Sequence, residues 1–251
     1  MLELVNVSKT FLRGTPNAHT ALDGFSLTLA DGAFATLLGT NGAGKSTLFA
    51  LIAGEYPPDG GSVRLDGEDV TFQPEHRRSR SIGRLFQDPM RGTAPDMTIL
   101  ENLALAGLRG KKSPLAPAVS RPDKKFLREQ VARLNMGLED RMDTRMGLLS
   151  GVQRQAVTLL MATLSVPKLL LLDEHTAALD PVTARQVLEL TKQIVAEHRI
   201  TTLMITHNVP SALELGDRTL MLSGGRVALD LTGEARKRMT PVELMERYTV
   251  C

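Results

Sequence analysis

The chain has 251 residues, of which 42% are hydrophobic and 23% are charged, as in an ordinary globular protein. Its 30 Lys and Arg residues nearly balance 28 Asp and Glu residues, giving a net charge of +2. Despite a pI near 8.8, this balance lacks the basic excess of a nucleic-acid-binding protein. The single cysteine, Cys251, excludes an intrachain disulfide or a thiolate metal cage and fits a reducing compartment.

The N-terminal residues 1–6 lack the basic and apolar regions of a signal peptide. No apolar run approaches the ~18 residues needed to cross a bilayer. We therefore expect any role at a membrane to require a partner.

The first part of the chain predicts strands at residues 2–7, 19–29 and 33–38, separated by the loop 10–16 and the turn 31–32. Phe11 lies in the first predicted loop. Its ring could form a flat surface for an adenine base or pack in the core, and the sequence leaves both interpretations open.

A glycine-rich motif of the form G-x-x-x-x-G-K-[ST] follows the third predicted strand. Behind it, residues 45–53 predict a helix that ends at Gly54. Glycines allow close approach of backbone N–H groups to anionic oxygens, while a lysine adds positive charge and a serine hydroxyl can bind Mg²⁺. A strand, this loop and a helix together predict a nucleoside triphosphate site made by Gly39, Thr40, Asn41, Gly42, Ala43, Gly44, Lys45, Ser46 and Thr47.

Beyond this loop, residues 62–67 and 81–86 predict further strands. The basic cluster 76–80 between them is expected to be a solvated loop, with a partner contact as the alternative. Gln87 ends the second of these strands, where its amide could reach Mg²⁺ or be an ordinary strand-end residue.

Residues 98–164 change from strand to helix patterns and predict a helical insertion. It includes a helix near residue 99, a basic and proline-bearing loop over 109–122, and a helix over 124–136. Ser150 then precedes a helix that runs to about residue 164. Its hydroxyl could simply cap this helix, or the helix N-terminus could bind phosphate.

Two adjacent carboxylates, Asp173 and Glu174, end a strongly apolar predicted strand over residues 168–174. The carboxyl edge of a parallel sheet is where ligands bind. We predict that Asp173 faces Mg²⁺ and that Glu174 acts on an attacking water, because consecutive strand residues point in opposite directions.

A turn at residues 178–180 precedes a helix that begins at Pro181 and runs to about His198. The strand 201–206 then delivers His207 to the same sheet edge, where it could contact a γ-phosphate or the water. The remaining tail from Asp217 predicts two strands and a terminal helix without identifiable chemistry.

Taken in order, these residues resemble the nucleotide-binding subunit of ATP-binding cassette (ABC) transporters over nearly the whole chain. The family has six short motifs in this order, which here are Gly39–Thr47, Gln87, Leu149–Gln153, Asp173-Glu174, Ala177–Asp180 and His207. The residues 92–95 and 173–180 are also similar to the ATPases of tryptophan/tyrosine-type uptake systems. The resemblance implies one α/β domain with a P-loop NTPase core and a mostly parallel sheet. It further implies an N-terminal antiparallel β subdomain, which together with the catalytic core covers residues 1–97 and 165–251. A helical subdomain covers residues 98–164.

The resemblance also implies ATP and Mg²⁺ as ligands, ATP hydrolysis, and a dimer with a second copy or a homologous ATPase. The signature residues Ser150, Gly151, Val152 and Gln153 of one subunit would face the ATP on the other subunit. Asp180 would lie near the nucleotide, and Gln87 would sense the γ-phosphate. A transmembrane permease and a substrate-binding protein would be partners, which places the chain at the cytoplasmic face of the cell membrane, and no nucleic acid is implied.

Two residues depart from the family pattern. Val152 stands where a second glycine is usual, and a β-branched residue resists positive φ and close approach to phosphate. His175 stands where proline is common, and the sequence assigns no role to its imidazole.

The expected function is that of an importer ATPase for a small solute such as an amino acid. A soluble single-cassette ATPase of an assembly machine is the alternative, and a regulatory subunit with weak hydrolysis is a further one. The transported substrate lies beyond this sequence, since specificity belongs to the partners.

Overall fold

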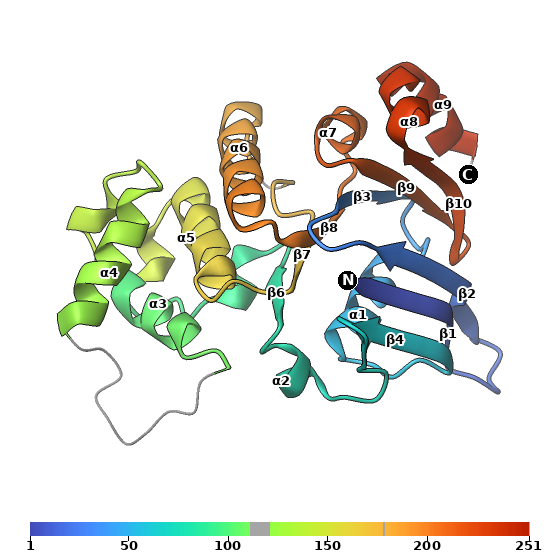
Figure 1. Ribbon diagram of the computed structural model, residues 1–251, viewed down its shortest axis with the longest axis horizontal. Coiled ribbons are helices and arrows are strands. Elements are labelled where there is room, and N and C mark those ends of the chain that lie inside the picture. The colour runs from blue at the N-terminus through green and yellow to red at the C-terminus, as the bar shows by residue number, and fades with distance from the viewer. Residues whose placement is uncertain (111–120, 178, 251) are drawn as a thin grey trace. The chain divides into compact units, whose positions relative to one another are not determined.

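Figure 1 shows the computed structural model of the chain, which describes residues 1–110, 121–177 and 179–250. The chain divides into two compact units, and each is described by itself. The first contains Met1–Ile82, Lys168–Asp173 and Arg199–Cys251, and the second contains Gly83–Pro167 and Glu174–His198. The segment 98–164, for which the sequence predicts a helical insertion, lies within the second unit.

Parallel strands form the centre of the first unit. Five strands lie side by side in the order β10, β9, β3, β8 and β7, and only β10 is antiparallel to its neighbour. Every residue of β3 and β8 is buried, as expected for apolar strands covered on both faces. The predicted mostly parallel sheet is therefore confirmed. The strands span Phe34–Gly39 (β3), Leu169–Asp173 (β7), Thr201–Ile205 (β8), Arg218–Ser223 (β9) and Arg226–Thr232 (β10).

A smaller antiparallel sheet contains the N-terminal strands in the order β2, β1, β4, β5. Its presence confirms the predicted antiparallel β subdomain. In β4, buried Val63 and Leu65 flank exposed Arg64, the alternation of a sheet with one face on a core. Strand β1 continues past the predicted end at residue 7, so Phe11 ends a strand instead of lying in a loop. The strands span Leu2–Phe11 (β1), His19–Leu29 (β2), Gly60–Leu65 (β4) and Glu68–Asp69 (β5).

Helix α1 (Lys45–Ala53) is embedded in the main core of the first unit. Leu48, Phe49 and Leu51 are fully buried. They share one apolar cluster with residues of both sheets, among them Leu4, Phe25, Leu37, Leu171 and Leu203. Gly54 ends the helix with a φ of 88°, as the sequence predicts, because glycine adopts the left-handed conformation without steric cost. The apolar run after Ser46 thus fixes the position of α1 against both sheets.

The remaining helices of the first unit gather beside β9 and β10 or near α1 (Figure 1). A second apolar cluster packs α7 and α9 onto β3 and β9 through Leu38, Val209, Ala212, Met221 and Leu244. These helices span Glu75–Arg78 (α2), Val209–Glu214 (α7), Gly233–Arg238 (α8) and Pro241–Val250 (α9).

The basic cluster 76–80 contains one buried arginine, which corrects the expectation of a solvated loop at that position. Arg78 is 2% exposed. Its guanidinium donates to four backbone carbonyls, those of Leu51, Ile52, Thr71 and Gln73, at 2.7–2.9 Å. Two of these carbonyls lie in the last turn of α1, where unpaired carbonyls and the negative end of the helix dipole attract a cation. Arg78 therefore caps the C-terminal end of α1.

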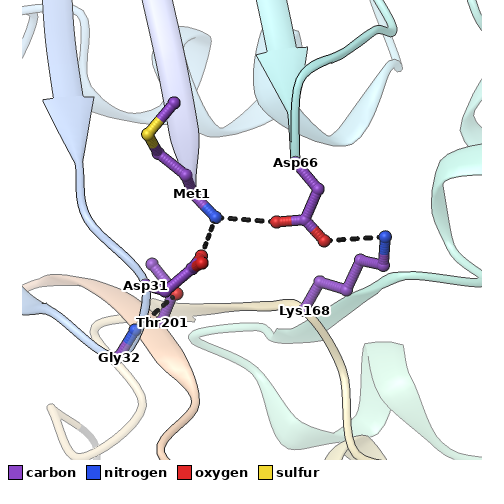
Figure 2. A network of polar contacts seen from close by, with 6 residues as sticks. All are labelled: Met1, Asp31, Gly32, Asp66, Lys168 and Thr201. Carbon is purple, nitrogen blue, oxygen red and sulfur yellow. Dashed lines mark hydrogen bonds and ion pairs between the residues drawn. The ribbon is translucent and has the colours of Figure 1, made fainter.

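A polar network ties the antiparallel sheet to the starts of the parallel strands (Figure 2). The Met1 amino group donates to Asp31 and, at 2.7 Å, to Asp66. Asp66 also pairs with Lys168 at 2.7 Å, and this hydrogen bond is the main cause that holds the pKa of the Asp66 carboxyl below its usual range. The network marks the edge of the sheet at which β7 and β3 begin, opposite to the edge at which they end.

The second unit is mostly helical. Among its described residues, an apolar cluster is contributed by α3, α4, α5 and the turns between them, including Leu103, Val131, Met146, Val157 and Leu160. Helix α4 begins at Arg121, three residues earlier than predicted, and residues 111–120 of the predicted loop lie outside the described residues. The elements span Ile82–Leu85 (β6), Pro89–Gly92 (η1), Ile99–Gly107 (α3), Arg121–Ala132 (α4), Leu138–Asp140 (η2), Met146–Leu148 (η3), Gly151–Thr163 (α5) and Pro181–His198 (α6).

Among the residues that the structure describes, no helix combines the length and the apolar character required to cross a bilayer.

Candidate functional site

The glycine-rich loop connects the end of β3 at Gly39 to the start of α1 at Lys45. Gly42 and Gly44 have φ values of 82° and 104°, which L-residues other than glycine rarely adopt. A Cβ on Gly44 would lie 2.2 Å from the Ala21 carbonyl oxygen, so β2 packs directly behind the loop. At Gly42, no atom of the described residues other than its chain neighbours lies within 4 Å of an added Cβ. The loop therefore packs against β2 at Gly44, whereas its backbone at Gly42 is open.

The first turn of α1 presents positive charge to this open side. The N-cap residue is Gly44, which has no side chain to cap the N–H groups of the turn. Lys45 is 6% exposed, and its ammonium donates to the carbonyls of Gly39 (2.6 Å) and Thr40 (3.0 Å). Backbone N–H groups, the positive end of the helix dipole and a lysine thus meet at the start of α1, an arrangement that suits a polyphosphate.

The β9–β10 turn forms another wall of the loop, and sequence analysis assigned it no role. The Gly225 N–H donates to the Ala43 carbonyl at 3.1 Å. A Cβ on Gly225 would lie 2.7 Å from the Ala21 carbonyl oxygen. On the other side, a Cβ on Gly39 would lie 2.6 Å from the Leu222 carbonyl oxygen. The loop backbone is therefore held between β2 and the C-terminal hairpin.

Strand register brings Asp173 and His207 to the same edge as the loop. Asp173, the last residue of β7, pairs with Ile205 of β8, and Ile205 pairs with Leu37 of β3. His207 follows two residues after β8 ends and is exposed. The Asn208 N–H donates to the Thr206 hydroxyl at 3.0 Å, which fixes the turn around His207. The structure thus gathers the loop, the carboxylate and the histidine at the carboxyl edge of the parallel strands, as predicted.

Phe11 has an aromatic neighbour that sequence analysis missed. The Tyr56 ring meets the Phe11 ring edge to face, with centroids 5.6 Å apart and planes at 84°. The Lys9 ammonium lies 5.8 Å from the Phe11 centroid and is anchored on Asp59 at 3.1 Å. The only sequence signal for Tyr56 is its place two residues after Gly54, which ends α1. Phe11 is therefore held by neighbours on two chain segments.

The second unit carries the other predicted site residues. Gln87 is exposed and lies two residues after β6 ends. Ser150 is the N-cap of α5: its hydroxyl accepts from the Gln153 N–H at 3.3 Å, and the Gln153 side chain accepts from the Ser150 N–H at 3.2 Å. This reciprocal capping box stabilises the helix start. The Ser150 hydroxyl proton is not used by the box, so the hydroxyl retains a donor for a ligand.

Val152 does not have the positive φ that a β-branched residue would resist. It is the second residue of α5 after Gly151 and is not among the residues with positive φ. Because helical φ is negative, a β-branched residue is accommodated at this position without strain.

Glu174 and Asp180 flank the turn between β7 and α6. Glu174 lies beyond the end of β7 and has a φ of 45°, so its direction is set by a left-handed turn residue and not by strand alternation as predicted. Such a conformation costs a non-glycine residue roughly 1–3 kcal/mol. Asp180 accepts from the N–H groups of Val182 and Thr183 at 3.2 Å, and the hydrogen bonds from Thr183 are the main cause of its lowered pKa. Of the predicted motif Ala177–Asp180, residue 178 lies outside the described residues.

Comparison with known proteins relates this geometry to a family. A family model described as ABC transporter matches residues 22–177. The tyrosine transport ATP-binding protein of Clostridioides difficile is 41% identical over 99% of this chain and 98% of that protein. The spermidine/putrescine import ATP-binding protein PotA of Haemophilus influenzae is 34% identical, and the match covers 92% of this chain but only 57% of PotA.

Solved structures show the same relationship. The dimeric, post-hydrolysis ATP-binding cassette MJ0796 bound to ADP and Pi has a TM-score of 0.78 and 27% identity, over 92% of this chain and 98% of that chain. The ADP conformation of the cassette MJ1267 has a TM-score of 0.82 and 26% identity, over all of this chain and 98% of that chain. With the phosphate loop, Asp173 and His207 at one sheet edge, these matches establish that the chain belongs to the ABC transporter family and is an ATP-binding ATPase of that family.

Proposed function

We propose that this chain is the ATPase subunit of an ABC importer that takes up an amino acid through a separate permease. The observation that carries this proposal is the 41% identity, over almost the full length of both chains, with a tyrosine transport ATP-binding protein. A methionine import ATP-binding protein of Vibrio vulnificus is also similar, at 34% identity over 90% of this chain and 64% of that protein. An aromatic amino acid is accordingly the first substrate to test.

In this proposal the phosphate loop binds the ATP phosphates through its backbone N–H groups and the Lys45 ammonium. The ammonium already lies within 3.0 Å of two loop carbonyls and would turn from them to the β- and γ-phosphates. Phe11 supplies the surface for adenine, and Tyr56 keeps its ring in place by the edge-to-face contact.

Ser46, Asp173 and Gln87 are the proposed Mg²⁺ ligands. Their hydroxyl, carboxylate and amide oxygens are the hard donors that this ion prefers, and Ser46 is exposed at the second position of α1. When bound, Mg²⁺ would neutralise charge on the phosphates. Asp173 is half-buried at the end of β7, so its carboxylate is fixed by the strand and not by a flexible loop.

Glu174 is the proposed general base, and its carboxylate polarises the water that attacks the γ-phosphate. His207 donates to the γ-phosphate from the turn that follows β8. A positioned general base is worth about 10²–10⁴ in rate, so we expect Glu174→Gln to bind ATP normally and to lose nearly all turnover. Wild-type turnover in this variant would remove Glu174 from the mechanism.

A dimer completes the proposed cycle. Ser150, Gly151, Val152 and Gln153 at the start of α5 would contact the ATP held by a second copy or a homologous ATPase, and Asp180 would lie beside it. The capped helix N-terminus offers N–H groups and a hydroxyl to an anion. Gln87 would report the presence of the γ-phosphate to the permease, and a substrate-binding protein would deliver the solute. The chain would thus work at the cytoplasmic face of the membrane.

Partner identification tests the transport proposal. The tagged chain is purified from detergent-solubilised membranes, and proteins that copurify are identified by mass spectrometry. Recovery of a multi-span permease supports an importer. If tyrosine or tryptophan then stimulates the ATPase activity of the complex between this chain and the permease in liposomes, the substrate class is assigned. Recovery of soluble proteins alone would instead favour an assembly ATPase, with the ATP chemistry unchanged.

A further inference from the structure

His175, the residue after the proposed general base, is buried in the second unit. Only 3% of its surface is exposed. Its Nε2 atom lies 3.3 Å from the hydroxyl oxygen of Thr191, a fully buried residue in the middle of α6. Buried polar groups are costly unless they find partners. The contact therefore joins the turn after β7 to the helix that follows the turn.

The direction of this hydrogen bond can be assigned. The Thr191 hydroxyl donates its only proton to the Val187 carbonyl at 2.8 Å, one turn earlier in α6. The oxygen therefore accepts from the imidazole, and Nε2 of His175 carries the hydrogen. His175 is thus a donor with a fixed ring orientation.

The turn that begins at Glu174 has a conformation that requires support. Glu174 has a φ of 45°, in a region that bulky residues adopt only when the surrounding structure holds them there. The Ala177 N–H donates to the Glu174 carbonyl at 2.9 Å, which closes the turn on one side. His175 is the next residue along the chain and is anchored on α6. These two contacts restrict the peptide groups that follow the Glu174 Cα.

We propose that His175 is a positioning residue: its Nε2–H bond to Thr191 anchors the turn on α6 and thereby aims the Glu174 carboxylate. The proposal rests on Glu174 being the general base. A purely apolar side chain could fill the same buried space but would leave the rotation of the turn unspecified, whereas a hydrogen bond specifies a direction. A proline, the residue common at this position in the family, would restrict the turn through its fixed φ.

Substitution of Thr191 tests the anchor without touching the turn. Thr191→Val keeps the shape and removes the acceptor, while Thr191→Ser keeps the hydroxyl. Because a misplacement of about 1 Å can cost ~10²-fold in rate, we expect Thr191→Val to lower kcat at least about tenfold and to leave KM for ATP within about twofold. His175→Phe should lower kcat similarly, the double variant no further, and Thr191→Ser should retain kcat.

Thr163→Val is the matched control. Thr163 is also buried and donates to a carbonyl one turn earlier, that of Leu159 at 2.8 Å in α5, but no histidine of the described residues hydrogen-bonds to it. Its substitution should leave kcat unchanged. All variants are assayed as full chains at a temperature where circular dichroism shows them folded.

The outcomes separate the two proposals. If Glu174→Gln loses turnover while Thr191→Val and His175→Phe turn over like wild type, the positioning role is wrong and the general base stands. If Glu174→Gln turns over normally, the general base is wrong. For variants that do not fold, ¹⁵N NMR of the wild-type imidazole decides: a proton on Nε2 supports the anchor, and a proton on Nδ1 alone overturns it.

Discussion

The stability of this protein should fall in mildly acidic solution because of one buried imidazole. Burial lowers the pKa of His175 from 6.5 to about 4. The unfolded chain therefore binds a proton near pH 6.5, whereas the folded protein binds it only near pH 4. Stability from this group is fully present above pH 6.5 and is lost as the pH falls through this interval.

The size of the effect follows from the two pKa values. The difference between 6.5 and about 4, at ~1.4 kcal/mol per pKa unit, gives a total loss of about 3.5 kcal/mol well below pH 4. At pH 5 about 2 kcal/mol of this is already lost, because the His175 imidazole is almost fully protonated in the unfolded chain at that pH and mostly neutral in the folded protein. Against an ordinary stability of ~5–15 kcal/mol, this loss is large.

Urea denaturation at pH 7.5 and pH 5.0 measures the effect. The chain has no tryptophan and two tyrosines, so circular dichroism at the helix band is the suitable signal. The matched variant is His175→Gln, whose amide cannot titrate but can still donate a hydrogen bond. Between the two pH values we expect the wild type to lose about 2 kcal/mol more than the variant. Equal losses in both proteins would refute the argument, since every other titrating group is common to both.

Two further predictions concern buried contacts behind the phosphate loop. Arg78→Met should lower the free energy of unfolding by roughly 3 kcal/mol or more, because several charge-assisted hydrogen bonds to carbonyls are lost together. Arg77→Met, at an exposed position of the same helix, should change it by less than about 0.5 kcal/mol; similar values for both would contradict the capping role. Gly225→Ala should raise the Kd for ATP measured by calorimetry, because the added Cβ would lie 2.7 Å from the Ala21 carbonyl oxygen and displace the turn whose N–H bonds the Ala43 carbonyl. Gly224 also has a positive φ, but no described residue beyond its chain neighbours lies within 4 Å of an added Cβ, so Gly224→Ala should leave the Kd near wild type. An equal increase in both variants would refute the role of Gly225 in supporting the loop.

The parts of the fold that sequence predicted well depend on local chemistry. Helix α1 spans Lys45–Ala53 and ends at Gly54, as predicted, because an apolar run and a left-handed glycine define both ends. Asp173 follows four buried leucines, and its place at the sheet edge follows from the parallel topology that such runs favour. His207 was placed at the same edge by the same reasoning.

The parts that sequence missed depend on contacts between distant segments. Nothing local distinguishes Arg78 from Arg77, and only the carbonyls at the end of α1 make one of them a buried cap. Likewise, Phe11 belongs to β1 because it pairs with His19 across the hairpin. The left-handed φ of Glu174 has no sequence signal, since that residue type does not favour it.

The phosphate loop itself shows how far local reasoning extends. Its glycines were explained by close approach to a ligand, and Gly42, with open space around it, fits that explanation. Gly39 also requires glycine for another reason, because the Leu222 carbonyl of the neighbouring strand leaves no room for a Cβ, and the two residues pair in the β3–β9 ladder. A side chain at Gly39 would thus collide with β9, whether or not it also contacted a phosphate. Loss of ATP binding in such a variant would report damage to the sheet, so only changes on the open side of the loop test the nucleotide contact itself.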